Sequence, residues 1–142
     1  MSDVPTEQAS KVTTTLVELG LWFSFEHDAQ GQPVWKLAPF KGDPPVEIRI
    51  SLSASNVSAY HWVPLQKQPQ RELLAKLLGV NYFSGFAKVG ILENPAQNWV
   101  GVSAQLAIRH LDKTALGEII GAVFSVSKEV HQLVETPGLL NS

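Results

Sequence analysis

Val46-Glu-Ile-Arg-Ile-Ser-Leu52 and Val57-Ser-Ala-Tyr-His-Trp-Val63 are the two runs of sequence that decide the fold. In the first run every second residue is apolar, which is the pattern of a strand with one buried face. The intervening residues, Ser53-Ala-Ser-Asn56, have the composition of a turn. The sequence therefore predicts two neighbouring antiparallel strands, and Pro64 is expected to close the second.

The residues before this pair extend the same sheet. Aromatic and apolar residues at strand period predict a strand over residues 21–27, followed by a turn and a partner strand at 34–37. Further upstream, apolar residues at helical spacing predict a helix over about residues 5–19, with Gly20 as its left-handed cap. We therefore expect one helix and then a meander of four antiparallel strands.

The residues after the pair predict a second helix, a hairpin and a long last helix. Pro69 suits a helix start, and a leucine-rich stripe continues to about residue 81. Strands are expected over about 86–92 and 99–108, and Asp112 is placed to cap the helix that Thr136 ends. The order α-β-β-β-β-α-β-β-α predicts an α+β fold with an antiparallel sheet of five or six strands.

Length and composition indicate one globular domain over residues 1–142, with loose ends at 1–4 and 136–142. The chain is 44% hydrophobic and 17% charged, as expected of a chain that builds one core. A net charge of −2 with scattered basic residues argues against nucleic acid as a partner. No secretory signal or membrane-spanning run is recognised, so a cytoplasmic location and no membrane partner are expected.

Candidate metal and cofactor sites are not supported by residue spacing. Cysteine is absent, and the histidines at 27, 61, 110 and 131 lack the spacing that places two ligands on one face of an element. Neither a phosphate-binding loop nor a dinucleotide fingerprint occurs. We therefore expect no metal and no cofactor.

Candidate catalytic residues are equally isolated. Ser125-Val-Ser-Lys128 matches the S-x-x-K spacing, but the companion motifs are missing and the match falls inside a predicted helix. Glu26 and Asp28 flank a predicted turn, and nothing in the sequence places Glu26 beside Glu47. The sequence therefore favours a protein that is not an enzyme.

Apolar side chains in excess of one core indicate a partner surface. Four leucines within six positions, from Leu73 to Leu78, make a wider stripe than a short helix needs to cover a sheet. We expect part of this stripe to face a second copy of the chain, although all four leucines inside one subunit is the alternative. The candidate dimer or partner surface comprises Leu73, Leu77, Val80, Tyr82, Phe86, Trp62 and Trp99.

A resemblance to a known family is carried by four segments: Leu77-Leu-Gly-Val-Asn-Tyr82, Ala87-Lys-Val-Gly90, Val100-Gly-Val-Ser103 and His110-Leu-Asp-Lys-Thr-Ala-Leu116. They resemble the YbjN-like proteins, which look like type III secretion chaperones of the Tir-chaperone kind. The resemblance implies the same order of elements and a homodimer that holds a protein segment without a catalytic residue. Asn81 and Asp112 resemble architectural positions, whereas Gly79 and the Lys41 to Pro45 insertion depart from the pattern.

Three functions follow from these observations. The first is a non-enzymatic chaperone-like or adaptor module that binds an unknown protein as a homodimer. The second is a small-molecule carrier or sensor with an apolar pocket between the sheet and the last helix, for which a closed cavity lined by Trp22, Trp35 and Trp62 would argue. The third is an enzyme with an unrecognised acid-base pair.

Overall fold

The structure is a computed structural model that describes residues 6–42, 44–66, 71–83, 87–93 and 96–136. Within these residues the predicted order of elements is confirmed. None of the described helices is long and apolar enough to cross a membrane. The elements are α1 (Thr6–Glu18), β1 (Phe23–His27), β2 (Pro33–Leu37), β3 (Arg49–Leu52), β4 (Asn56–Leu65), α2 (Arg71–Phe83), β5 (Lys88–Leu92), β6 (Asn98–Ala107), a short 3₁₀ turn (Ile108–His110) and α3 (Lys113–Glu135).

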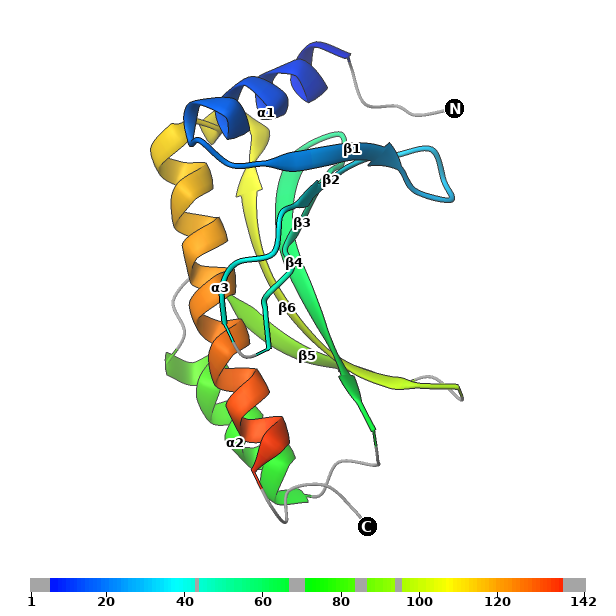
Figure 1. Cartoon of the computed structure of the whole chain (residues 1–142), viewed down its shortest axis with the longest axis vertical. Coiled ribbons are helices and arrows are strands. Elements are labelled where there is room, and N and C mark those ends of the chain that lie inside the picture. Colours follow the sequence, from blue (N-terminus) through cyan, green and yellow to red (C-terminus); the bar gives the residue numbers. More distant parts are fainter. Residues whose placement is uncertain (1–5, 43, 67–70, 84–86, 94–95, 137–142) are drawn as a thin grey trace.

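The described strands form one antiparallel sheet of six strands in the order β1-β2-β3-β4-β6-β5. The first four make the predicted meander, and the β5–β6 hairpin joins it through β6, which pairs with β4 over ten residues. The described helices α1, α2 and α3 all lie on one side of this sheet (Figure 1). The sheet therefore has a covered inner face and an uncovered outer face.

The core lies between the inner face and the helices. Trp35 of β2 is fully buried, and its indole N–H donates to Thr13 Oγ1 of α1 at 2.9 Å. Its burial is favourable because the one polar atom of the ring has a partner. Along β4, inner-face residues alternate with more exposed outer-face ones. The buried residues of α3 are Leu116, Ile119, Ile120, Val123, Val126, Ser127 and Val130.

Two predicted helix ends are confirmed. Gly20 has a positive φ of 74°, and its amide donates to the Val17 carbonyl at 2.9 Å as α1 ends. A left-handed residue closes the helix there, and glycine adopts this conformation without steric cost. The Asp112 side chain accepts a hydrogen bond from the Ala115 amide at 2.7 Å, so it caps α3 as expected.

The prediction that Pro64 closes its strand is wrong, because β4 continues through Pro64 to Leu65. Pro64 pairs with Trp99 of β6. On the other side of β4, β3 pairs only with residues 57–60. Beyond residue 60, β3 no longer pairs with that side of β4. A proline, which has no amide hydrogen to donate, is tolerated at such an edge.

The strand predicted over residues 46–52 is shorter, since β3 begins at Arg49. The residues before it form a crossover segment, which we define as residues 38–42 and 44–48. Phe40 and Val46 bridge each other inside this segment, and the Phe40 ring lies 5.5 Å from that of Phe124 in α3. The residues on either side of the predicted insertion thus pack beside α3 (Figure 1), whereas Lys41, Gly42 and Pro45 within it are exposed.

Asn81 closes part of the free edge of the sheet. Its side-chain Nδ2 donates to the Val89 carbonyl at 2.7 Å, and its Oδ1 accepts from the Val89 amide. A side-chain amide thereby takes the place of a neighbouring strand at the centre of β5. Unpaired groups on an edge strand invite pairing with other chains, so this contact both fixes α2 to β5 and protects the edge.

We predict that Asn81→Ala lowers the free energy of unfolding by about 1–3 kcal/mol, because two backbone groups of a half-buried strand lose their partners. Urea unfolding followed by circular dichroism measures this loss. Lys76→Ala is the matched control, since Lys76 is an exposed residue of the same helix and surface changes stay within about 0.5 kcal/mol. Equal stability of the two variants would contradict the assigned role of Asn81.

Candidate functional site

The uncovered outer face carries an unusual row of residues across three strands. Trp62 of β4 pairs with Gly101 of β6, which pairs in turn with Gly90 of β5. Directly paired residues point to the same face of a sheet. One large ring therefore lies next to two positions that have no side chain.

Gly101 is required by the position of the Trp62 ring. A Cβ atom added at Gly101 would lie 2.6 Å from a ring carbon of Trp62, which is closer than carbon atoms approach without bonding. A Cβ atom added at Gly90 would meet nothing within 4 Å. The ring thus rests on the backbone of β6 and leaves the backbone of β5 bare.

This arrangement forms a hollow that we call the glycine trough. It has a volume of about 290 Å³ and is lined by Tyr60, Trp62, Gly90, Ile91, Leu92, Gly101, Val102 and Ser103. The walls keep large apolar surfaces in contact with water, since Trp62 is 40% exposed and Leu92 is 48% exposed. An exposed apolar hollow with few polar groups is typical of a surface that binds another molecule.

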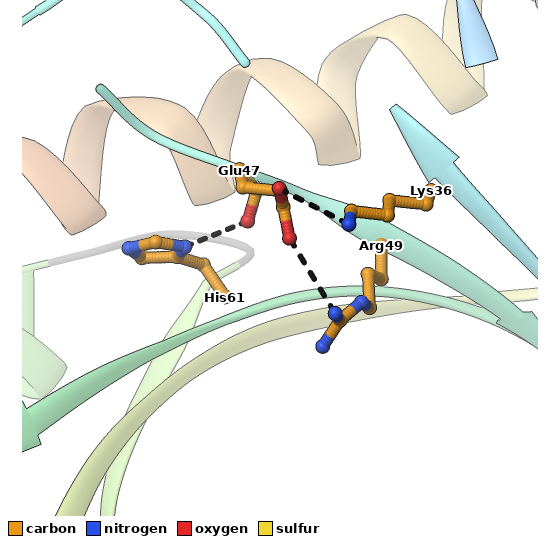
Figure 2. Close-up of polar contacts among 4 residues, drawn as sticks. All are labelled: Lys36, Glu47, Arg49 and His61. Atoms are coloured by element: carbon orange, nitrogen blue, oxygen red, sulfur yellow. Dashed lines mark hydrogen bonds and ion pairs between the residues drawn. The ribbon is translucent and has the colours of Figure 1, made fainter. Parts of the chain in front are cut away.

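A small cluster of charges borders the trough. The carboxylate of Glu47 lies 3.7 Å from Lys36 Nζ and 3.5 Å from Arg49 Nη2, as Figure 2 shows. Both ion pairs are partly exposed, so each contributes little to stability. Each oxygen of the Glu47 carboxylate faces one cation, Oε2 toward Lys36 and Oε1 toward Arg49. Burial raises the pKa of the neighbouring Tyr60, which keeps its hydroxyl neutral.

The structure brings together two histidines that sequence spacing kept apart. His61 Nε2 of β4 lies 2.9 Å from His131 Nε2 of α3, although 70 residues separate them. His61 Nδ1 lies 2.7 Å from the Glu47 carbonyl oxygen (Figure 2). The alternation of residues along β4 could have indicated this contact. It places His61 on the inward face together with Val57, Ala59 and Val63, and a buried polar group requires a partner.

Burial is the main cause that lowers the pKa of both histidines. For His61 the Glu47 carbonyl and carboxylate oppose the effect, whereas for His131 the nearby His61 adds to it and Glu135 opposes it. Both rings are therefore neutral at physiological pH. Two imidazole nitrogens do not complete a metal site, and the described part of the chain holds no group of three candidate ligands.

The remaining candidates for chemistry have structural roles or are exposed. Asp28 Oδ1 accepts hydrogen bonds from the amides of Gln30 and Gln32, so it shapes the β1–β2 turn. Lys128 Nζ lies 5.4 Å from the centre of the Phe124 ring, and Ser125 is exposed beside it. His27 and His110 are exposed as well. Nothing in these positions assembles a nucleophile with a base.

The predicted partner surface is divided by the structure. Trp62 and Trp99 lie on the outer face, but Leu73 and Leu77 are buried in the core of the chain and Val80 packs against that core. The outward leucines are their neighbours, Leu74 and the 69% exposed Leu78. Periodicity defines the width of an apolar stripe but not which edge of it faces the sheet. Phe86 and the side chain of Tyr82 lie outside the described residues.

Trp22, Trp35 and Trp62 lie in different environments and do not line one closed cavity. Trp35 is fully buried in the core, whereas Trp22 is 84% exposed next to β1. Trp22 and Trp62 line separate hollows, and both hollows are open to solvent. The structure therefore provides no common pocket for these three side chains.

We predict that Gly101→Ala lowers the free energy of unfolding by about 1–3 kcal/mol, because the new methyl group displaces the Trp62 ring. Gly90→Ala is the matched control and should change stability by less than about 0.5 kcal/mol. Combining Gly101→Ala with Trp62→Ala should remove most of the penalty of the first change. Urea unfolding of the parent chain, Gly90→Ala, Gly101→Ala, Trp62→Ala and the double variant measures these terms. Equal effects of the two glycine variants would refute the packing of Trp62 on Gly101.

Comparison with known proteins places the fold. No family model and no curated protein sequence matches the chain. Among solved structures it is similar to the type III secretion chaperone SycH of Yersinia pestis, in complex with a stable fragment of YscM2, with a TM-score of 0.55 and 18% identity over 89% of this chain and 98% of that one. It is also similar to ExsC in the ExsC–ExsE complex, with a TM-score of 0.61 and 14% identity over 97% and 100% of the two chains.

A third similar structure is YbjN from E. coli, with a TM-score of 0.54 and 18% identity over 89% of this chain and 87% of that one. All three similarities extend over most of both chains. The resemblance to YbjN-like proteins and to type III secretion chaperones is therefore confirmed for the fold: this chain has the α+β architecture that these proteins share.

Proposed function

We propose that this protein is a non-enzymatic, chaperone-like or adaptor module that binds a segment of another protein and acts as a homodimer. The glycine trough is the observation that carries the proposal. It exposes apolar side chains and bare strand backbone on a face of the sheet that the described helices leave uncovered. An apolar side chain of a partner would displace water from this hollow, which is the principal source of affinity at protein interfaces.

The shape of the trough suits an extended protein segment. Its floor is the backbone at Gly90 and its walls are Trp62 and Leu92. A segment lying across β5 and β6 would place every second side chain toward the sheet, since side chains of an extended chain alternate. Two proteins of this fold, SycH and ExsC, are known in complexes with the proteins YscM2 and ExsE. These complexes support binding of a protein by the present chain.

The other two functions receive less support. An enzyme needs a nucleophile or acid next to a base, and the described candidates are dispersed or engaged in ion pairs. A carrier of small molecules encloses most of its ligand. The hollows described here are open to solvent instead.

A second copy of the chain is the proposed cover for the outward side of α2. Leu74 and Leu78 are exposed on this helix, and Asn81 near its end joins α2 to the edge strand β5. A two-fold axis beside α2 would bury both leucines of each copy against the other. Leu74 and Leu78 therefore replace Leu73 and Leu77 in the proposed seam, and the buried pair holds the helix on its own sheet.

We predict that a photo-crosslinking amino acid at position 92 captures a specific protein in the native cell. Leu92 lines the trough, so a bound segment would lie within reach. The control is the same amino acid at Ser55, an exposed position in the β3–β4 turn. Gly90→Leu fills the trough without meeting other atoms at its Cβ and should abolish the adduct at position 92. Mass spectrometry identifies the captured protein.

The outcomes of this experiment separate the functions. An adduct that depends on Gly90 and is absent at position 55 supports the binding module. An adduct that survives Gly90→Leu, or equal labelling at both positions, contradicts the trough as the binding site. The melting temperature of Gly90→Leu should equal that of the parent chain, which distinguishes a blocked site from an unfolded domain.

We predict that Leu78→Asp converts a dimer into a folded monomer, because it places a charge in the seam and leaves the core intact. Leu73→Asp should instead unfold the chain, since a charge at a fully buried position has no partner there. Size exclusion with light scattering gives the mass, and circular dichroism reports folding. A parent chain with the mass of a single copy at micromolar concentration would refute the dimer.

A further inference from the structure

Three parts of the fold meet at the histidine pair. His61 lies in β4, His131 lies in the last turns of α3, and the Glu47 carbonyl belongs to the crossover segment. The rings are tilted at 51° with their centres 5.2 Å apart, so they meet through their nitrogen atoms and are not stacked. A single chain of hydrogen bonds therefore links the crossover segment, the sheet and the helix.

The positions of the protons in this chain follow from its acceptors. A carbonyl oxygen only accepts, so His61 Nδ1 carries a hydrogen and donates to Glu47 at 2.7 Å. In the neutral ring His61 Nε2 is then an acceptor. His131 Nε2 must consequently donate across the 2.9 Å contact, which leaves His131 Nδ1 without a hydrogen.

The same geometry tolerates one added proton but not two. A proton on His131 Nδ1 leaves the bond between the two rings intact. A second proton on His61 Nε2 would point one N–H group at another across 2.9 Å and place two positive charges in contact. Because His61 is only 8% exposed, water cannot screen this repulsion effectively. The two rings must then separate.

The carboxylates of Glu47 and Glu135 favour the protonated rings, but burial outweighs them. Glu47 of the crossover segment is engaged by Lys36 of β2 and Arg49 of β3. In α3, Glu135 lies one turn after His131 and Lys128 lies over the Phe124 ring. Tyr60 of β4 stays neutral. The charged residues of α2, which also packs on α3, are exposed: Arg71, Glu72 and Lys76.

A second contact region joins the crossover segment to the end of α3. Gly42 and Pro44 face Lys128, His131, Gln132 and Glu135 across a small hollow of about 50 Å³. The aromatic contact between Phe40 and Phe124 lies two turns earlier along the helix. Val130 is buried, and Leu133 and Val134 pack against the core, so separation of the histidines would shift the crossover segment and the last turns of α3 relative to each other without detaching the helix.

We propose that His61 and His131 form a proton-operated latch between the sheet, the crossover segment and the end of α3. The latch is closed at neutral pH and opens in mildly acidic solution. The sign follows from the lowered pKa of each ring relative to the value of about 6.5 in an unfolded chain. The stabilisation is complete above that value and is lost as the pH falls toward the lower pKa values of the folded protein.

The absence of cysteine from the sequence allows a direct test by site-specific labelling. Lys41→Cys and Gln132→Cys introduce two nitroxide labels at exposed positions on the two sides of the latch. Double electron-electron resonance then gives the distribution of distances between the labels. We expect a narrow distribution at pH 7.5 and a longer, broader one at pH 5.0, with unchanged far-ultraviolet circular dichroism.

His131→Gln is the decisive variant because an amide can both donate and accept, so its bond to His61 survives either protonation state. In this background the distribution should be the same at both pH values, whereas His110→Gln, a change at an exposed histidine, should leave the acid response intact. An unchanged distribution in the labelled parent chain, a response that persists in His131→Gln, or unfolding of the whole chain at pH 5.0 would overturn the latch.

The unlabelled chain provides a second measurement. Nuclear magnetic resonance titration of the four histidines should show that His61 and His131 titrate below the ordinary value of about 6.5, in two coupled steps. Four histidines with the same titration midpoint would overturn the proposal even if the labelled chain did not fold.

Discussion

The burial of one face of a single sheet is the constraint on which the rest of this structure depends. The described helices α1, α2 and α3 lie on the same side of the sheet, so the central strands β3 and β4 divide their residues between a dry face and a wet one. The alternating residues of β4 show this division along their whole length. A shift of one residue in register would exchange the two faces, so the sequence pattern and the layer order enforce each other.

On the wet face, the same constraint accounts for the glycine trough. A sheet face without helices is normally polar, yet here Trp62 lies on Gly101 and leaves Gly90 uncovered. Glycine weakens a strand because it adds entropy to the unfolded chain and offers no side chain to pack. Two glycines paired across β5 and β6 therefore lower the stability of the sheet. They also leave open the hollow that we assign to a protein partner.

On the dry face, buried polar side chains are stabilised by hydrogen bonds, within their own helix for Thr15 of α1 and between elements for Trp35 and His61. The indole of Trp35 bonds Thr13 of α1, and His61 is held between Glu47 and His131. Ser127 is an exception among the fully buried residues, because its Oγ has no hydrogen-bond partner among the described residues and nothing in the structure explains it. The histidine pair differs from the tryptophan bond in one respect: both of its rings can take up a proton, with pKa values that burial lowers, so we expect this contact to respond to acid.

The sequence by itself determined the elements, their order and most of their ends, because periodicity, Gly20 and Asp112 act over a few residues. It did not determine which half of the leucine stripe in α2 faces the sheet, since Leu73 and Leu78 differ only in the rotation of the helix. Nor did it determine that β4 continues through Pro64, which depends on where β3 stops pairing. Only the tertiary structure placed Trp62 on Gly101 and His61 beside His131, because those contacts arise when strands and helices distant in the chain pack together.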